Sequence, residues 1–193
     1  MSSAFQHMVT LLSFVLALGV SHQLFTFVEM VRAGSRVKWS LVHGLWMLNS
    51  FLAVIAWWFG IWDFHNIEEW SVFSVLLNLL AVLCVFLAIA FVCPRIPETG
   101  PIDLVKFHNL HSKKYIGFTV GELVLGAGEA LYYGNVYNVP GQNLQAGIIG
   151  FMGITALAAL FASNPTAQRI AAIATVAASV VFLVVGDPVL RSN

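Results

Sequence analysis

Two glutamates lie in an otherwise apolar stretch of the chain, the segment GELVLGAGE at residues 121–129. Glu122 and Glu129 are seven residues apart, so on a helix they share one face at roughly 10 Å separation along the axis. An ionisable side chain at membrane depth is costly and usually faces a bundle interior or a wet cavity. Because burial brings the titration of a carboxyl group towards neutral pH, we interpret both residues as a proton relay or cation site.

A polar stripe is predicted on the first apolar segment, which contains SHQLFTFVEM at residues 21–30. His22, Thr26 and Glu29 follow the spacing of one helical face. The stripe is expected to run from mid-membrane to the basic sequence RAGSRVK, which follows the segment. The expected partner of His22 is one of the two glutamates described above.

The next two apolar segments add further polar side chains. His43 is expected near the depth of Glu29 and would act as a gate or mouth residue on the cytoplasmic side. Asn49 and Asn78 are expected as supporting polar groups. Imidazoles titrate near neutral pH, so the histidines and glutamates at successive depths have the chemistry of a proton pathway.

Metal or haem binding is an alternative interpretation of the same histidines. Imidazole and carboxylate groups suit zinc, iron or manganese, and His22 and His43 are the histidines within apolar segments. His108 and His111 have i, i+3 spacing and form a separate weak candidate pair for a divalent metal. Tight ligand motifs such as HExxH are missing from the sequence, so no cofactor is predicted, and haem or a divalent metal is kept as the alternative.

The composition is that of a membrane protein. Hydrophobic residues make up 59% of the 193 residues and charged residues only 9%, whereas soluble domains average about 25% charged residues. Mean hydropathy is +0.85. The formal net charge is zero and basic residues are scattered, which argues against a nucleic-acid partner because phosphate binding needs a clustered basic face. The lipid bilayer is the expected environment.

Six apolar segments are long enough to cross a membrane, which takes about 20 residues. They predict an all-α bundle of six transmembrane helices in a single domain over residues 1–193, with spans at about 8–31, 39–62, 70–93, 115–136, 143–163 and 167–186. Cytoplasmic loops of membrane proteins are enriched in Lys and Arg. Eight of the nine Lys and Arg residues fall on one side of this arrangement and only Arg191 on the other. Both termini, and the acidic loop with Asp63, Glu68 and Glu69, are therefore predicted on the non-cytoplasmic side, and the chain resembles a small protein of a bacterial inner membrane.

The longest connection, residues 94–114, is predicted as a cytoplasmic linker. Apolar residues recur at helical spacing from Asp103 onward with basic residues beside them, which is typical of a short amphipathic helix on the membrane surface. Spans four and five are rich in glycine, and small residues at four-residue spacing let helices approach closely. A homo-oligomer through these two spans is therefore expected.

These features favour a proton- or cation-conducting channel or transporter. The proposed pathway residues are His22, Glu29, His43, Glu122 and Glu129. Two alternatives stay open: a non-catalytic accessory, sensor or scaffold subunit, and the redox protein with haem or metal. An enzyme is not favoured, because the spans contain no GxSxG nucleophile motif and no phosphate-binding loop, and no catalytic residue is assigned.

Overall fold

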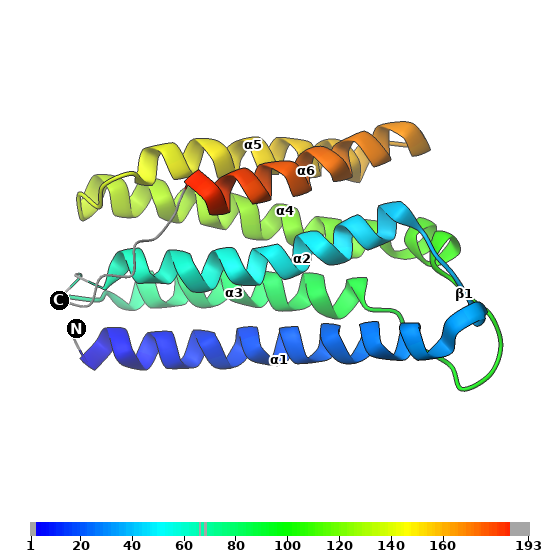
Figure 1. Cartoon of the computed structure of the whole chain (residues 1–193). Coiled ribbons are helices and arrows are strands. Elements are labelled where there is room, and N and C mark those ends of the chain that lie inside the picture. Colours follow the sequence, from blue (N-terminus) through cyan, green and yellow to red (C-terminus); the bar gives the residue numbers. More distant parts are fainter. Residues whose placement is uncertain (1–2, 66, 68, 186–193) are drawn as a thin grey trace.

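The computed structural model describes residues 3–65, 67 and 69–185 (Figure 1). Helices account for nearly all of this part of the chain. They are α1 (Ser3–Ala33), η1 (Gly34–Arg36), α2 (Leu41–Gly60), η2 (Ile61–Phe64), α3 (Val72–Val92), α4 (Leu104–Val136), α5 (Gln142–Phe161) and α6 (Pro165–Val185), joined by the two-residue strands β1 (Val37–Lys38) and β2 (Ile102–Asp103). Glu68 and Arg191, which were assigned to the non-cytoplasmic side, lie outside the described residues, as does residue 186 of the sixth span.

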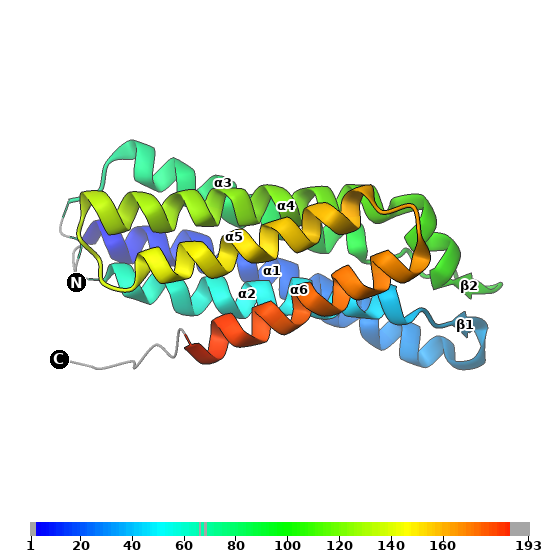
Figure 2. The same cartoon turned by 90° about the horizontal axis from the view of Figure 1, so that it is seen from above.

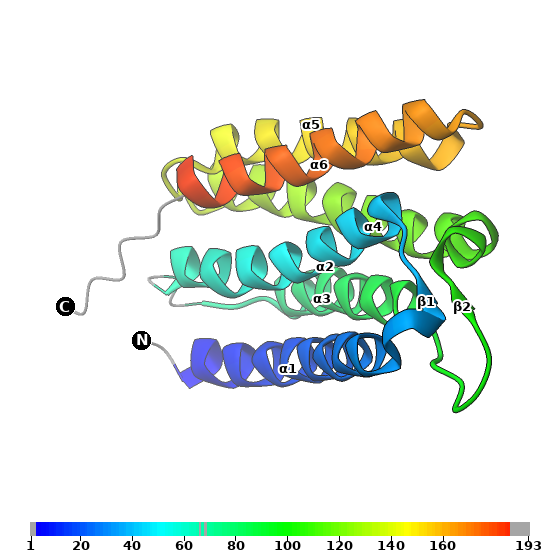
Figure 3. The same cartoon turned by 45° about the vertical axis from the view of Figure 1, so that its right-hand side comes forward.

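The long helices form two layers that lie side by side (Figure 1). One layer contains α1, α2 and α3, and the other contains α4, α5 and α6. The layers meet where α4 packs on α3 and where α6 packs on α2. α1 lies at the outer edge and packs against α3 and α2 (Figures 1 and 3). The core therefore extends through both layers, and it includes residues of α1 such as Leu12 and residues of α3 such as Val82.

Local sequence signals set the starts of the helices. Side chains of Ser40, Ser71 and Asp103 accept hydrogen bonds from backbone N–H groups three residues later, at 3.3, 3.0 and 2.9 Å, and so cap α2, α3 and α4. Gly141 precedes α5 with a φ of 80°, a left-handed conformation that glycine adopts without strain. The predicted spans differ from the observed helices by only a few residues, except that the fourth span was predicted from residue 115 and α4 begins at Leu104 after the Asp103 cap.

The outer surface of the bundle suits a lipid environment. Five helical segments of the described chain are long and apolar enough to cross a membrane, and they contain α1, α2, α3, α5 and α6. Large apolar side chains point outward from them, including Phe25 at 72% and Phe161 at 77% exposure. These features are those of an integral membrane protein. α4 is more polar than these five helices and lies against α3 and α5 (Figure 2). That α4 is a sixth transmembrane span therefore stays a prediction.

Residues 94–114 differ from the predicted linker with its separate surface helix. The helix that begins at Leu104 continues to Val136, so residues 104–114 are the first part of α4. The sequence from His108 to Gly117 contains no proline that would end the helix. The first turns of α4 nevertheless run at an angle to the rest of it (Figures 2 and 3).

A pair of two-residue strands connects the two layers at the end of the bundle where α4 begins. β1 and β2 pair in parallel, with Val37 opposite Ile102 and Lys38 opposite Asp103 (Figure 3). Lys38 Nζ lies 3.0 Å from Asp103 Oδ2. The hydrogen bond from the Lys106 backbone and the contact with Lys38 both lower the pKa of Asp103. Asp103 thus stays ionised as both helix cap and ion-pair partner.

Some glycines of α4 and α5 lie at contacts between these two helices. A Cβ atom on Gly126 would lie 3.8 Å from Ile149 of α5, and one on Gly153 would lie 3.8 Å from Leu123 of α4. These glycines therefore let α4 and α5 approach closely, as small residues do in membrane bundles. A homo-oligomer through the same helices stays a prediction.

Asn78 and Tyr133 join α3 to α4 deep inside the bundle, and both are fully buried. Asn78 Nδ2 donates to Tyr133 Oη at 2.8 Å and to the Ser74 carbonyl at 2.9 Å. We expect Tyr133→Phe to lower the free energy of unfolding by about 1 kcal/mol, the net value of one buried hydrogen bond. Thermal unfolding of purified protein in detergent measures this. Equal melting temperatures for the wild type and Tyr133→Phe would show that the bond is unimportant.

Candidate ion-binding site

The buried side of α4 contains the two glutamates because of its sequence spacing. Buried positions recur at alternating intervals of four and three residues, which is the period of a seam between packed helices. This seam includes polar and small residues, namely Tyr115, Thr119, Glu122, Gly126, Glu129 and Tyr133. Both carboxylates therefore point into the bundle, as their seven-residue spacing suggested.

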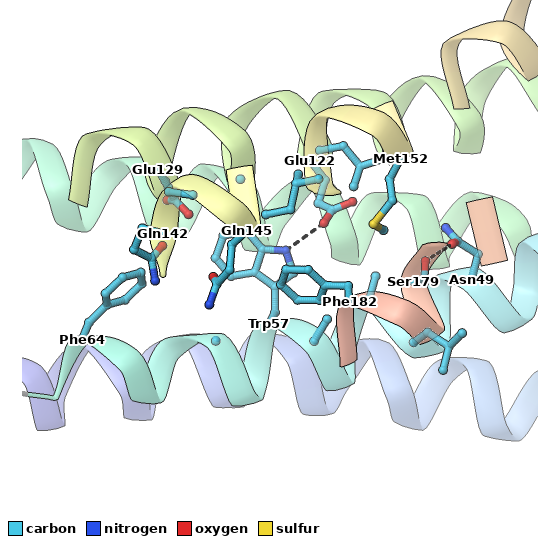
Figure 4. A pocket seen from close by; sticks show the side chains of 18 residues that line it. Asn49, Trp57, Phe64, Glu122, Glu129, Gln142, Gln145, Met152, Ser179 and Phe182 are labelled. Atoms are coloured by element: carbon cyan, nitrogen blue, oxygen red, sulfur yellow. Dashed lines mark hydrogen bonds between the residues drawn. The ribbon is translucent and has the colours of Figure 1, made fainter. Parts of the chain in front are cut away.

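A cavity of about 70 Å³ lies where this seam faces α2, α5 and α6 (Figure 4). Its walls are mostly apolar, with Ala53 and Ala56 from α2, Ile149 from α5 and Phe182 from α6. A water molecule needs roughly 10–15 Å³ of such space, so the cavity has room for several waters or a small ligand.

Glu122 and Glu129 are the ionisable groups that line the cavity. Glu122 is 7% exposed, and Trp57 Nε1 donates to its Oε1 at 2.9 Å (Figure 4). Glu129 is 3% exposed, and its Oε1 has no hydrogen-bond partner among the described residues. Lysine and arginine are missing from the buried residues of the described chain. The two carboxylates therefore have no buried lysine or arginine among the described residues to balance their charge.

Two glutamine side chains from the first turn of α5 close the end of the cavity beside Glu129 (Figure 4). Their amide groups are oriented by Asp63 of η2, whose Oδ2 accepts from Gln145 Nε2 at 2.9 Å and from Gln142 Nε2 at 3.4 Å. With both amide nitrogens directed towards Asp63, the carbonyl oxygens remain as acceptors. Sequence reasoning missed both glutamines, although their i, i+3 spacing at a helix start places them on one face.

A second polar pair lies at the other end of the cavity. Ser179 of α6 donates to Asn49 Oδ1 of α2 at 2.9 Å, and both side chains are buried (Figure 4). Thr175 lies one turn before Ser179 and contacts Thr155 of α5 at 2.9 Å. Asn49, predicted as a supporting polar group, is thus at the cavity wall, whereas Asn78 joins α3 to α4 at a different place.

The stripe predicted on α1 does not reach this cavity. His22 and Glu29 are exposed, and Glu29 Oε1 accepts from Arg32 at 3.1 Å. Thr26 is buried, but its hydroxyl donates to the His22 carbonyl of its own helix. The expected partnership of His22 with Glu122 or Glu129 does not form, because α1 packs against α2 and α3 and leaves His22 outside. Helical spacing showed which residues share a face but not which way that face points.

The other predicted histidines gather near the start of α4. His43 is fully buried, and its ring packs against Phe107 and Tyr115 at centroid distances of 5.3 and 6.3 Å. Neither ring nitrogen of His43 has a hydrogen-bond partner among the described residues. His111 stacks obliquely on Phe107 at 4.7 Å. His43 is therefore separated from the cavity, and a role as gate or mouth residue stays a prediction.

The described part of the chain contains no set of side chains that would form a metal centre. No group of three or more His, Cys, Asp or Glu side chains there is arranged to hold a metal ion. His22 is exposed, whereas His43 is buried among aromatic rings, so these two have different surroundings. His108 uses both ring nitrogens, one with the Tyr115 hydroxyl and one with Gln168 Oε1 at 3.0 Å.

His108 gives the stability of the bundle a pH dependence. Burial lowers its pKa below the ordinary value of 6.5, although the hydrogen bond to Gln168 acts in the opposite direction. The unfolded chain then binds a proton at His108 more tightly than the folded chain does. The contribution of neutral, buried His108 to the free energy of unfolding is therefore present above about pH 6.5 and lost as the pH falls. We expect the melting temperature to fall between about pH 7.5 and pH 5.5, and to fall less in His108→Gln. Identical pH slopes for both proteins in thermal unfolding would contradict this.

The chain was compared with protein-family models, with curated proteins and with solved structures. It matches no family model, no curated protein and no solved structure. The functional argument therefore rests on the geometry of the cavity and its carboxylates.

Proposed function

We propose that the protein is a membrane transporter that exchanges protons for a cation at Glu122 and Glu129. One observation carries this proposal: two buried carboxylates face one cavity without a buried Lys or Arg among the described residues. An ionised carboxylate in this environment is too costly to persist alone. Each group is therefore neutralised by a proton or by a bound cation, and competition between the two couples their movements.

The surroundings of the site support access from one end of the bundle. A smaller cavity of about 20 Å³ shares Ala56, Gly60, Gln145 and Phe182 with the main cavity and also contacts Asp63. Asp63 in turn borders a surface groove of about 380 Å³ together with Glu69. These acidic residues would attract cations to the mouth of the site. By the distribution of Lys and Arg, this mouth is on the non-cytoplasmic side.

Towards the opposite end, the seam is filled by large side chains. Trp46, Tyr115 and Ile116 are each only 1% exposed, and the rings of Trp46 and Tyr115 are 6.4 Å apart. A site that is closed towards one end only by two glutamine side chains and a small neighbouring cavity, and towards the other end by packed aromatic rings, fits a transporter that alternates its access better than an open channel. The buried seam of α4 would be the element that rearranges.

Purified protein in liposomes tests this function. A pH-sensitive dye is enclosed, and inward gradients of sodium, potassium, short alkylammonium ions or short alkyldiammonium ions are imposed in turn. We expect one class of cation to drive protons out only in liposomes that contain the protein. Protein-free liposomes show passive leakage. If a correctly folded protein moves no protons with any of these cations, the transport proposal is wrong and an accessory or scaffold role takes its place.

A further inference from the structure

We infer that the cavity takes a short linear diamine in its doubly protonated form, with one ammonium group at each glutamate. This inference rests on the proposed function, because it names the class of cation that the same site would carry. It is built on the separation of the carboxylates, the apolar surface between them, the missing partner of Glu129 and the volume of the cavity.

The separation of the carboxylates favours two positive charges over one. Glu122 and Glu129 are seven residues apart on one helix, which places their Cα atoms roughly 10 Å apart along the axis. In Figure 4 the two carboxylates lie on either side of the Trp57 ring, and metal ions bind oxygen ligands at about 2.0–2.6 Å, so one ion does not contact both carboxylates in this arrangement. A single small ammonium would neutralise one glutamate and leave the other alone. Two ammonium groups on one molecule satisfy both.

The middle of the cavity suits an aliphatic chain. Gly126 lies between the two glutamates on the buried seam and has no side chain to fill the space. A Cβ atom there would lie 3.8 Å from the Trp57 ring and 3.8 Å from Ile149. Gly126 therefore faces one aromatic and one aliphatic side chain. In Figure 4 the Trp57 ring lies between Glu122 and Glu129. Methylene groups would be well packed here, whereas a hydrated inorganic ion would not.

Both glutamates have hydrogen-bond acceptors for an ammonium group. Glu129 Oε1 is buried without a partner among the described residues and lies beside the glutamines that Asp63 orients. Glu122 lies between Glu129 and the Ser179–Asn49 pair (Figure 4). Trp57 uses one oxygen of Glu122, and a carboxylate has capacity for further donors. Charge-assisted N–H···O bonds are about twice as strong as neutral ones. The aromatic face of Trp57 adds attraction for a cation.

The size of the cavity sets the length of the diamine. At roughly 10–15 Å³ per water-sized group, the volume of about 70 Å³ holds about five to seven non-hydrogen atoms. Bonds of roughly 1.5 Å put the nitrogens of an extended four-carbon diamine about 6 Å apart. Two N–H···O bonds of about 2.8 Å bring the span to roughly 10–12 Å, which matches the glutamate spacing. A chain of three to five carbons is therefore expected.

Calorimetric titration of the purified protein in detergent tests the ligand class. The probes are diaminopropane, diaminobutane, diaminopentane and diaminooctane, all with terminal amines, with butylamine as the single-charge control. We expect the tightest binding among the three shorter diamines. Butylamine should bind about tenfold more weakly or worse, because it lacks one charge-assisted hydrogen bond. In Glu122→Gln the advantage of diaminobutane over butylamine should largely vanish, and an unchanged melting temperature confirms that the variant is folded.

The outcomes separate this inference from the proposed function. If butylamine binds as tightly as diaminobutane, or if no diamine binds, the inference is wrong. In that case, proton exchange driven by sodium, potassium or a monoamine would still support the proposal that the protein is a transporter. Tight diamine binding without any cation-driven proton movement would overturn transport but confirm the ligand class. If Glu122→Gln keeps the full preference for diamines, the two-carboxylate geometry is refuted.

Discussion

Glu129→Gln is expected to reduce cation-driven proton movement about tenfold or more, which corresponds to the loss of one charge-assisted hydrogen bond. The amide has nearly the same shape as the carboxyl group but neither binds a proton in exchange nor balances a cation. Because Glu129 has an oxygen without a partner in the described chain, the substitution removes no structural contact of that atom. The flux assay in liposomes with an enclosed pH dye measures the effect.

Glu29→Gln provides the matched control for this result. Glu29 belongs to the predicted pathway, but it is exposed on α1 and contacts Arg32. The structure therefore predicts an unchanged flux for Glu29→Gln. For Glu129→Gln it predicts an unchanged or higher melting temperature, so that a loss of flux in this variant is not a loss of folding. If Glu29→Gln stops the flux and Glu129→Gln does not, the pathway follows α1 and the cavity is not the site.

Gly126→Leu is expected to abolish ligand binding and to reduce flux to the level of protein-free liposomes. The four added carbons would occupy most of a cavity of about 70 Å³. Overpacking costs about 1–3 kcal/mol in a filled core, and a Cβ atom at Gly126 already contacts Trp57 and Ile149, so part of this cost is expected as a lower melting temperature. Gly126→Ala adds only one methyl group, which would lie in ordinary contact at 3.8 Å from Trp57 and Ile149. We expect this smaller change to keep the fold and weaken binding only in part.

Gly128→Leu is the control on the same helix. Gly128 is exposed, and a Cβ atom there meets nothing within 4 Å. The added leucine would contact lipid, so flux and diamine binding should be unchanged. Titration and flux measurements on both leucine variants test whether the cavity is needed for binding and transport. Melting temperatures check that both variants are folded. Equal losses in Gly126→Leu and Gly128→Leu would show that the cavity has no special role.

The sequence predicted most of the fold because its signals are local. Apolar runs of membrane length give the helices, and caps such as Ser40, Ser71 and Asp103 give their starts. The seven-residue spacing of Glu122 and Glu129 likewise showed that they share a helical face. The two-residue pairing of β1 with β2 was missed, because strands this short have no periodicity to read.

What the sequence alone determined is a helical membrane protein with two glutamates on one face of an otherwise apolar helix. Only the tertiary structure decided that this face points inward while the stripe of His22 and Glu29 stays outside. The reason is that helical periodicity defines a face but not its neighbours, which depend on how all the helices pack. Trp57 comes from α2, 65 residues before Glu122 in the chain, whereas Gln142 and Gln145 come from α5, the helix that follows α4. Their convergence on one cavity follows from the packing of α2 and α5 against α4.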